Sequence, residues 1–172
     1  MIFRETTKKD IKNVMDIINA SKEYLKKNNI NQWQNGYPNE EVILNDIKNG
    51  EAFILLDNEN TIIGTIAISF RGESTYDKIY EGKWLTNSEY AVIHRIAIKD
   101  DLKGRGISRE ILKEAEKLCL NKNINSIKID THEENLSMQR FLEKSGFKYC
   151  GIIYLNSGLE CGEKRIAFEK LI

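Results

Sequence analysis

Several features that direct a protein toward other architectures are scarce or missing in this 172-residue chain, which has one proline and three cysteines. It contains no run of about 18 apolar residues, which excludes a membrane-spanning helix. The chain becomes charged within its first five residues, before the apolar segment of a signal peptide could form. Cys119, Cys150 and Cys161 lack the spacing of a zinc site, and their odd number fits no complete disulfide framework. We therefore expect a cytoplasmic protein without disulfides and without a metal.

The chain also has no net charge, because 26 Lys and Arg residues balance 26 Asp and Glu residues. Affinity for nucleic acid comes mostly from a cationic surface that releases counterions, so nucleic-acid binding is excluded as the main task. Hydrophobic residues make up 41% of the sequence, which is enough for a packed core and excludes a disordered chain. With no repeat or linker along it, residues 1–172 are expected to form one domain.

Hydrophobic periodicity predicts an α/β fold in which helices flank a mixed, largely antiparallel sheet. Apolar residues at helical spacing from Ile11 to Leu25 indicate a first helix, and a second follows Pro38 with Asn39 as its N-cap. Residues 71–88 show no clean period and are expected to form a long loop. The remaining patterns predict strands over 2–4, 52–56, 61–70, 90–98, 126–130, 147–155 and 164–171, and further helices after Gly106 and over 135–145.

The most informative segment is the turn Lys103-Gly104-Arg105-Gly106-Ile107-Ser108, which lies between a predicted strand and a predicted helix. Free N–H groups and the positive dipole at a helix start bind phosphate, and glycines let an anion approach the backbone. Lys103, Arg105 and Arg109 add positive charge, while Ser108 can serve as the N-cap or offer a hydroxyl. Two glycines can equally form an ordinary tight turn, so both interpretations stay open at this point.

Together with two further segments, this turn resembles the GNAT superfamily of acyl-CoA-dependent N-acyltransferases. The segments are His94 to Ile98 before the turn and Asn135 to Phe147 after it. The family's pyrophosphate loop reads Arg/Gln-x-x-Gly-x-Gly/Ala, which places Lys103 at the first position, Gly106 at the central glycine and Ser108 at the last position. The resemblance covers nearly the whole chain and implies a GNAT-like fold with acetyl-CoA as cosubstrate.

The resemblance also implies which residues hold the cosubstrate. The backbone of Ile96, Ala97 and Ile98 would pair with the pantetheine arm, since a peptide-like arm can extend a sheet edge. The pyrophosphate would lie against Lys103, Gly104, Arg105, Gly106, Ile107, Ser108 and Arg109. Asn135 would lie near the thiol, although it can also be a helix N-cap, and both roles can hold together.

The implied reaction is direct attack of a neutral amine on an acetyl thioester, which needs a proton acceptor and a donor for the carbonyl oxygen. A backbone N–H at Ile96 or Ala97 is the simplest oxygen-binding donor. His94 is a candidate base because imidazole titrates near neutrality, and a purely structural role for it stays open. Glu89, at the entrance of the same strand, is a second candidate that would act through a water.

The sequence differs from the family at the residue that would protonate the departing thiolate. Many members carry a tyrosine acid where this chain has Leu142. We expect Tyr149 to substitute, with Tyr154 and Tyr90 as alternatives. A thiol with a pKa of about 8.5 can also leave as thiolate and take its proton from water.

Two aromatic segments are candidates for acceptor recognition. Trp33 and Tyr37 lie between the first two predicted helices, and Trp84 lies in the long loop, where such rings can form the wall of a pocket for a small amine. The alternative is that the tryptophans only pin loops to the core. From Glu73 to Glu89 there are four acidic and two basic residues, a net charge of −2 that favours a cationic amine.

Three functions stay open on the sequence alone. The first is an N-acetyltransferase acting on a small amine or a peptide amine, with neither nucleic acid nor membrane as partner. The second is a non-catalytic acyl-CoA-binding sensor or interaction domain, which Leu142 keeps open. The third is an interaction domain in which the glycine turn is only structural. A homodimer through the C-terminal strands is also left open.

Overall fold

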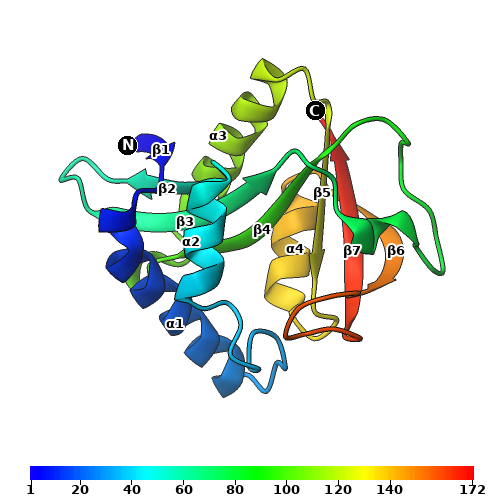
Figure 1. Cartoon of the computed structure of the whole chain (residues 1–172), viewed down its shortest axis with the longest axis horizontal. Helices are drawn as coiled ribbons and strands as arrows, with labels where there is room; N and C mark the ends of the chain where they lie inside the picture. Colours follow the sequence, from blue (N-terminus) through cyan, green and yellow to red (C-terminus); the bar gives the residue numbers. More distant parts are fainter.

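The structure, a computed structural model that describes all residues 1–172, is built on one seven-stranded sheet (Figure 1). The strand order is β1-β2-β3-β4-β5-β7-β6, and every neighbouring pair is antiparallel except the parallel pair β4 and β5. The strands are β1 (Ile2–Glu5), β2 (Ala52–Leu56), β3 (Ile62–Ser69), β4 (Ala91–Ile98), β5 (Ser126–Thr131), β6 (Lys148–Tyr154) and β7 (Lys164–Leu171). The helices are α1 (Ile11–Lys27), α2 (Glu40–Lys48), α3 (Ile107–Asn121) and α4 (Leu136–Lys144), with 3₁₀ turns at Lys8–Asp10, Ser74–Asp77 and Asp100–Leu102. The predicted sheet flanked by helices is confirmed.

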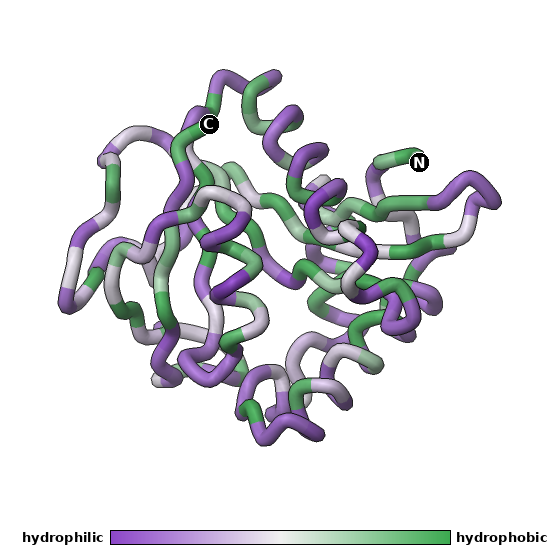
Figure 2. The backbone as a smooth tube through the Cα atoms, turned by 180° about the vertical axis from the view of Figure 1, so that it is seen from behind, coloured by the Kyte–Doolittle hydropathy of each residue, from purple (hydrophilic) through white to green (hydrophobic).

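Helices cover both faces of the sheet, which explains why β2 and β3 are buried along their whole length. On one face, α1 and α2 bury Val14, Ile18 and Ile43 against the strands. On the other face, α3 buries Ile111 and Ala115 in the largest hydrophobic cluster, to which α4 also contributes. Figure 2 shows hydrophobic residues along the central strands and many hydrophilic residues on the helices. Burial of the apolar faces of the helices against the sheet provides most of the driving force for folding.

The start of α3 differs from one sequence expectation. Gly106, not Ser108, is the N-cap residue, and it adopts the left-handed conformation with φ of +82°. Ser108 is the second residue of the helix, so its predicted N-cap role is wrong, whereas its hydroxyl still lies at the first helical turn. Glycine reaches a positive φ without the steric cost that any other residue would meet.

The long segment between β3 and β4 is more ordered than the sequence predicts. Its first part forms the 3₁₀ turn Ser74–Asp77, and Tyr80 then makes an isolated antiparallel bridge with Ile152 of β6. Two backbone hydrogen bonds of 2.8 Å join these residues, so the segment covers part of the free edge of β6. An edge protected in this way is less open to pairing with another chain.

The sheet opens at its parallel pair. β4 and β5 are paired only at Ala91 with Ile127 and at Val92 with Lys128, so the rest of β4 has a strand neighbour on one side alone. The register between β3 and β4 also shifts near Arg95, whose φ of +52° is unusual for a residue with a side chain. Such a bulge redirects backbone groups and side chains. Backbone donors and acceptors of β4 are therefore available toward β5.

Candidate active site

A cleft of about 1380 Å³ is lined by β4 beyond Val92 and by the end of β5. Its donor end is formed by the turn before α3 and by α4. Its acceptor end is formed by the segment between α1 and α2, by the start of the long loop and by the connection between β6 and β7. Most residues proposed from the sequence meet in this one cleft. These are Trp33, Tyr37, His94, Ile96, Ala97, Ile98, Lys103, Gly104, Gly106, Ile107, Ser108, Arg109 and Asn135.

The backbone at the donor end presents a set of free donors. The N–H groups of Gly104, Gly106, Ile107 and Ser108 make no backbone hydrogen bond within the protein. Gly104 and Gly106 both have a positive φ, and a Cβ added to either would meet no atom within 4 Å. The turn is thus an open cradle at a helix N-terminus, and its donors fit a diphosphate. The functional interpretation of the glycines fits this geometry.

Positive side chains surround this cradle. Lys103 is bound to Asp100, and its ammonium lies 3.7 Å from the ring centroid of Tyr24 on α1. Arg140 and Lys144 of α4 line the same end of the cleft, although sequence reasoning did not single them out. Their spacing of four residues places them on one helix face, which is the signal that could have found them. Arg105 is not among the lining residues and extends from the exposed outer side of the turn.

The free side of β4 continues the donor end. Lys99 donates its N–H to Ile63 of β3 at 2.9 Å, and donor direction alternates along a strand, so the N–H of Ile98 faces away from β3. Asn135 accepts the N–H of Met138 at 3.2 Å, which confirms its helix N-cap role. Its amide also donates to Gln32 at 2.9 Å and links α4 to the acceptor end.

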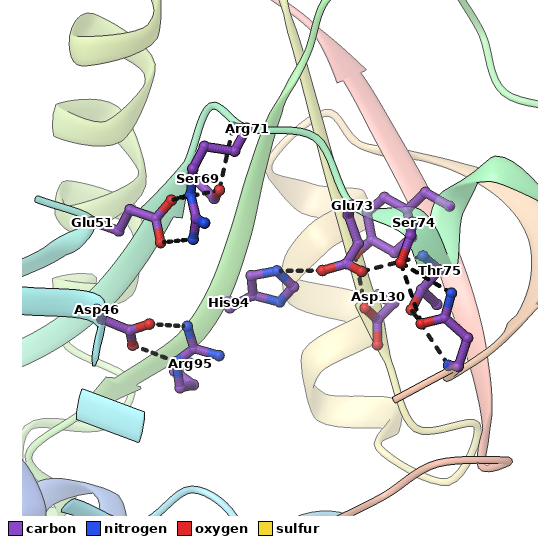
Figure 3. A network of polar contacts seen from close by, with 12 residues as sticks. Asp46, Glu51, Ser69, Arg71, Glu73, Ser74, Thr75, His94, Arg95 and Asp130 are labelled. Atoms are coloured by element: carbon purple, nitrogen blue, oxygen red, sulfur yellow. Dashed lines mark hydrogen bonds and ion pairs between the residues drawn. The ribbon is translucent and has the colours of Figure 1, made fainter. Parts of the chain in front are cut away.

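His94 extends from β4 toward Glu73 (Figure 3). Its Nε2 lies 3.5 Å from Oε2 of Glu73, and both side chains are about one quarter exposed. Glu73 also accepts the N–H of Thr75 at 3.2 Å, which fixes the carboxylate at the start of the 3₁₀ turn. Its contact with His94 lowers the pKa of Glu73 to about 2, so the carboxylate is ionised at neutral pH. This arrangement suits an imidazole that takes a proton while a carboxylate orients it.

A second polar group lies beside this pair. Asp130, at the end of β5, accepts the hydroxyl of Tyr76 at 2.7 Å. Burial raises the pKa of Asp130, although His94 and Arg165 lower it in part. Arg165 is 2% exposed and lies 3.0 Å from Glu160, which in turn accepts the backbone N–H of Trp33 at 2.6 Å.

A third group ties the acceptor end to the bulge of β4. The guanidinium of Arg95 makes two hydrogen bonds of 2.8 Å to Asp46 on α2, and it donates to the hydroxyl of Tyr37 at 2.6 Å. Burial raises the pKa of Asp46 in spite of this arginine. Because Arg95 carries the strained φ, these bonds hold the bulge in place.

Other residues proposed from the sequence lie outside the cleft. Glu89 is exposed on the surface before β4. Tyr149 is 52% exposed, and its ring packs edge-on against the buried Phe168 of β7 without lining the cleft. Trp84 donates to the carbonyl of Tyr76 at 2.9 Å and packs on that ring, so it pins the loop, as in the structural alternative.

Tyr154 and Tyr90, the alternative candidates for the acid, also lie outside the cleft. Tyr154 is 46% exposed, and Tyr90 contacts the backbone of Glu73 without lining the cavity. Leu142 is fully buried in the main hydrophobic cluster. A side chain at this position of α4 therefore points into the core of this protein.

The acidic character of the acceptor end has a different origin from the expected one. Of the four acidic residues counted between positions 73 and 89, only Glu73 lines the cleft. Four further carboxylates line this end: Asp46 and Glu51, which are paired with arginines, and Asp130 and Glu160, which come from a strand end and a distant loop. The one local signal for Asp130 is a carboxylate near the end of a strand, directly after the alternating apolar residues Ile127 and Ile129.

Two general features can be stated plainly. None of the four α-helices combines the length and apolar character that a membrane span requires. No group of three or more His, Cys, Asp and Glu side chains is arranged as metal ligands.

Comparisons with known proteins identify the family. The model of the "Acetyltransferase (GNAT) family" matches residues 14–147. A solved GNAT-family acetyltransferase from Streptococcus agalactiae is 33% identical, with a TM-score of 0.88 over 99% of this chain and 95% of that one. PaiA N-acetyltransferase from Thermoplasma acidophilum, solved with coenzyme A, is 18% identical, with a TM-score of 0.71 over 99% and 98% of the two chains. Ribosomal-protein-alanine N-acetyltransferase from Brucella melitensis is 15% identical, with a TM-score of 0.67 over 100% of both. No curated protein matches the chain. Because the family model matches most of the chain and the Streptococcus relative is 33% identical over nearly all of it, the chain belongs to the GNAT acetyltransferase family.

Proposed function

We propose that this protein transfers an acetyl group from acetyl-CoA to a primary amine of a small molecule. One observation carries the proposal, namely that a cradle of free N–H groups and a histidine–carboxylate pair line the same cleft. The first can hold a diphosphate and the second can take a proton from an amine. Family membership supports acetyl-CoA as the donor.

The donor end would hold the cosubstrate through its backbone. The N–H groups at Gly104, Gly106, Ile107 and Ser108 would bind the pyrophosphate, and Lys103 and Arg109 would balance its charge. The free edge of β4 at Ile96 to Ile98 would pair with the pantetheine arm. When bound, acetyl-CoA supplies an activated acetyl thioester. The N–H of Ile96 would donate to the thioester oxygen, because the alternation that turns the Ile98 N–H away from β3 also turns that of Ile96 away, whereas the N–H of Ala97 faces Thr65 of β3.

The acceptor amine must be neutral to attack, and His94 would accept its proton. Glu73 would orient the imidazole through its contact with Nε2 and would stabilise the charged ring. Because contact with His94 lowers the pKa of Glu73 to about 2, this carboxylate stays ionised throughout the neutral range. The carboxylate of Asp130 adds negative charge to the field at the imidazole, and Arg165 lies 3.9 Å from that carboxylate.

The departing thiolate would leave without a tyrosine acid. Leu142 occupies the position at which the family often has one, and it is fully buried. The three tyrosines expected to replace it do not line the cleft. A thiolate whose conjugate acid has a pKa of about 8.5 is a fair leaving group at neutral pH, so protonation by water suffices.

Thiol release tests the proposal. Purified protein with acetyl-CoA is assayed against amino acids, diamines, aminoglycosides and peptides with a free N-terminus. We expect release that depends on a small amine and that falls strongly in His94→Gln. Turnover with a peptide amine alone would replace the small-molecule acceptor with a protein one. Tight acetyl-CoA binding without turnover by any amine would favour the sensor, the alternative that Leu142 keeps open.

A further inference from the structure

The acceptor end carries more negative charge than its own cations neutralise. Its arginines are largely committed, because Arg95 is bound through two hydrogen bonds to Asp46 and Arg71 through two to Glu51 (Figure 3). The carboxylates that remain are Glu73, Asp130 and Glu160, and the remaining cations are Arg165 and, when protonated, His94. When all three carboxylates are ionised and the imidazole is neutral, one arginine leaves this end with a net charge of −2.

Asp130 is the carboxylate with free capacity. Its Oδ2 accepts from Tyr76, but the nearest cation to its Oδ1 is Nε of Arg165 at 3.9 Å, which is too long for a hydrogen bond. The side chain is 12% exposed and lines the cleft. A carboxylate oxygen in this position can accept a charge-assisted hydrogen bond from a ligand.

Aromatic side chains give a second and independent indication. Trp33 and Tyr37 line the same end of the cleft. The 2.6 Å bond from the Trp33 backbone N–H to Glu160 holds this segment against the connection between β6 and β7. Aromatic faces attract cations, as the Arg95 guanidinium 6.0 Å from the Tyr37 ring centroid shows, so rings that line the same end of the cleft as an incompletely paired carboxylate favour a cationic ligand.

An anionic acceptor group is disfavoured here, because the arginines of this end already face carboxylates. Arg165 is 2% exposed, donates to the carbonyl of Lys164 at 2.9 Å and forms an ion pair with Glu160 at 3.0 Å. Its Nη2 makes no hydrogen bond, but that atom is buried beside Glu160. A ligand carboxylate would therefore have to displace Glu160 and leave that buried charge unpaired, which is costly.

We propose that the acceptor carries two amino groups, one acetylated beside His94 and a second, still protonated, held by the carboxylate of Asp130. This inference rests on the proposed function and makes it narrower: the substrate class is a small aliphatic diamine. Asp130 is then a specificity-determining residue. The reacting amine loses its proton to His94, whereas the second ammonium keeps its charge throughout.

Three acceptors of equal chain length separate the alternatives. Cadaverine has two amines, pentylamine has one, and 5-aminopentanoic acid carries a carboxylate in place of the second amine. For the wild-type protein we expect kcat/KM for cadaverine to exceed that for pentylamine by about tenfold or more, as for a charge-assisted hydrogen bond. The amino acid should be the poorest of the three.

Asp130→Asn removes the charge but keeps the shape and an oxygen for the Tyr76 hydroxyl. It should reduce the ratio of kcat/KM for cadaverine to that for pentylamine to within about threefold. A changed field at His94 alters the turnover of both amines alike, so it cancels in this ratio, and acetyl-CoA affinity should stay nearly unchanged. Tyr76→Phe should keep the preference, because the carboxylate remains. Asp77→Asn is the matched control, since Asp77 lies one residue beyond Tyr76 and is exposed outside the cleft.

The outcomes distinguish this inference from the proposed function. Equal turnover of cadaverine and pentylamine, or a preference unchanged in Asp130→Asn, overturns the diamine inference but leaves amine acetylation intact. If Tyr76→Phe also loses the cadaverine preference, the preference belongs to the side chain of Tyr76, and the diamine inference is overturned as well. If no amine is acetylated, the proposed function fails, and calorimetry of cadaverine with CoA-loaded protein still reports on Asp130. Weaker cadaverine binding in Asp130→Asn than in the wild type would support the ammonium site at Asp130. Equal binding by the two proteins would contradict that site.

Discussion

The two ends of the cleft are built from different materials. The donor end consists mainly of backbone, with free N–H groups at the start of α3 and along the unpaired side of β4. The acceptor end consists of side chains from distant parts of the sequence, with Trp33, Glu73, Asp130 and Glu160 brought together by the fold. A backbone site tolerates many side chains, whereas a site made of side chains changes with each substitution. The comparison explains how one scaffold can keep its donor while its acceptor varies.

The largest effect is expected from Gly106→Asp at the donor end. A carboxylate facing a bound diphosphate costs several kcal/mol, so we expect acetyl-CoA affinity to fall by about a thousandfold. The positive φ of this position strains any side chain, but Asp adopts the left-handed region more readily than most residues and a Cβ here meets no atom within 4 Å, so the fold should survive. Isothermal titration with acetyl-CoA measures the change.

Gly162→Asp is the matched control for backbone strain. Gly162 has a φ of +88°, against +82° for Gly106, and a Cβ there also meets nothing within 4 Å. It lies outside the cleft, so this variant should bind acetyl-CoA like the wild type. Unchanged affinity in Gly106→Asp would show that the cradle does not hold the pyrophosphate.

The next largest effect is expected at the acceptor end from Asp46→Ala. Asp46 is 4% exposed, and its removal leaves the guanidinium of Arg95 without its charged partner. Breaking a buried pair from one side costs about 3 kcal/mol of unfolding free energy. Urea denaturation measures the loss. Glu110→Ala, which breaks the exposed pair with Lys113 on α3, should lower the unfolding free energy far less, because water and salt screen an exposed ion pair. Similar losses in both variants would contradict the role given to Arg95 and Asp46.

His94→Gln should separate chemistry from donor binding. We expect kcat to fall by about a hundredfold, as for loss of a general base, while acetyl-CoA affinity stays unchanged because the donor end is intact. Stopped assays with a saturating amine measure kcat. The control is His132→Gln at the only other histidine, which lies outside the cleft and accepts the N–H of Glu134 at 3.2 Å. A wild-type rate in His94→Gln would assign proton transfer to another group.

The difference between the two ends also explains what the sequence could predict. The helices, the strands and the turn at Gly104 and Gly106 follow from local patterns, since periodicity and turn chemistry act over a few neighbouring residues. Glu73 pairs with His94, which lies 21 residues further along the chain, and Asp46 pairs with Arg95, which lies 49 residues further. No local pattern encodes such a contact. The buried position of Leu142 likewise follows from how α4 packs on the sheet.

The smallest effects are expected from residues that the sequence suggested but the fold places outside the cleft. Tyr149→Phe removes only a hydroxyl on β6, and Glu89→Gln neutralises an exposed carboxylate. Surface substitutions of this kind change little, so kcat and the acceptor KM should stay within about twofold of the wild type. The same thiol-release assay measures both. A tenfold fall in kcat for Tyr149→Phe would mean that the acid reaches the thiolate by a path that this cleft does not show. The donor end would then depend on a side chain after all, and its contrast with the acceptor end would be lost.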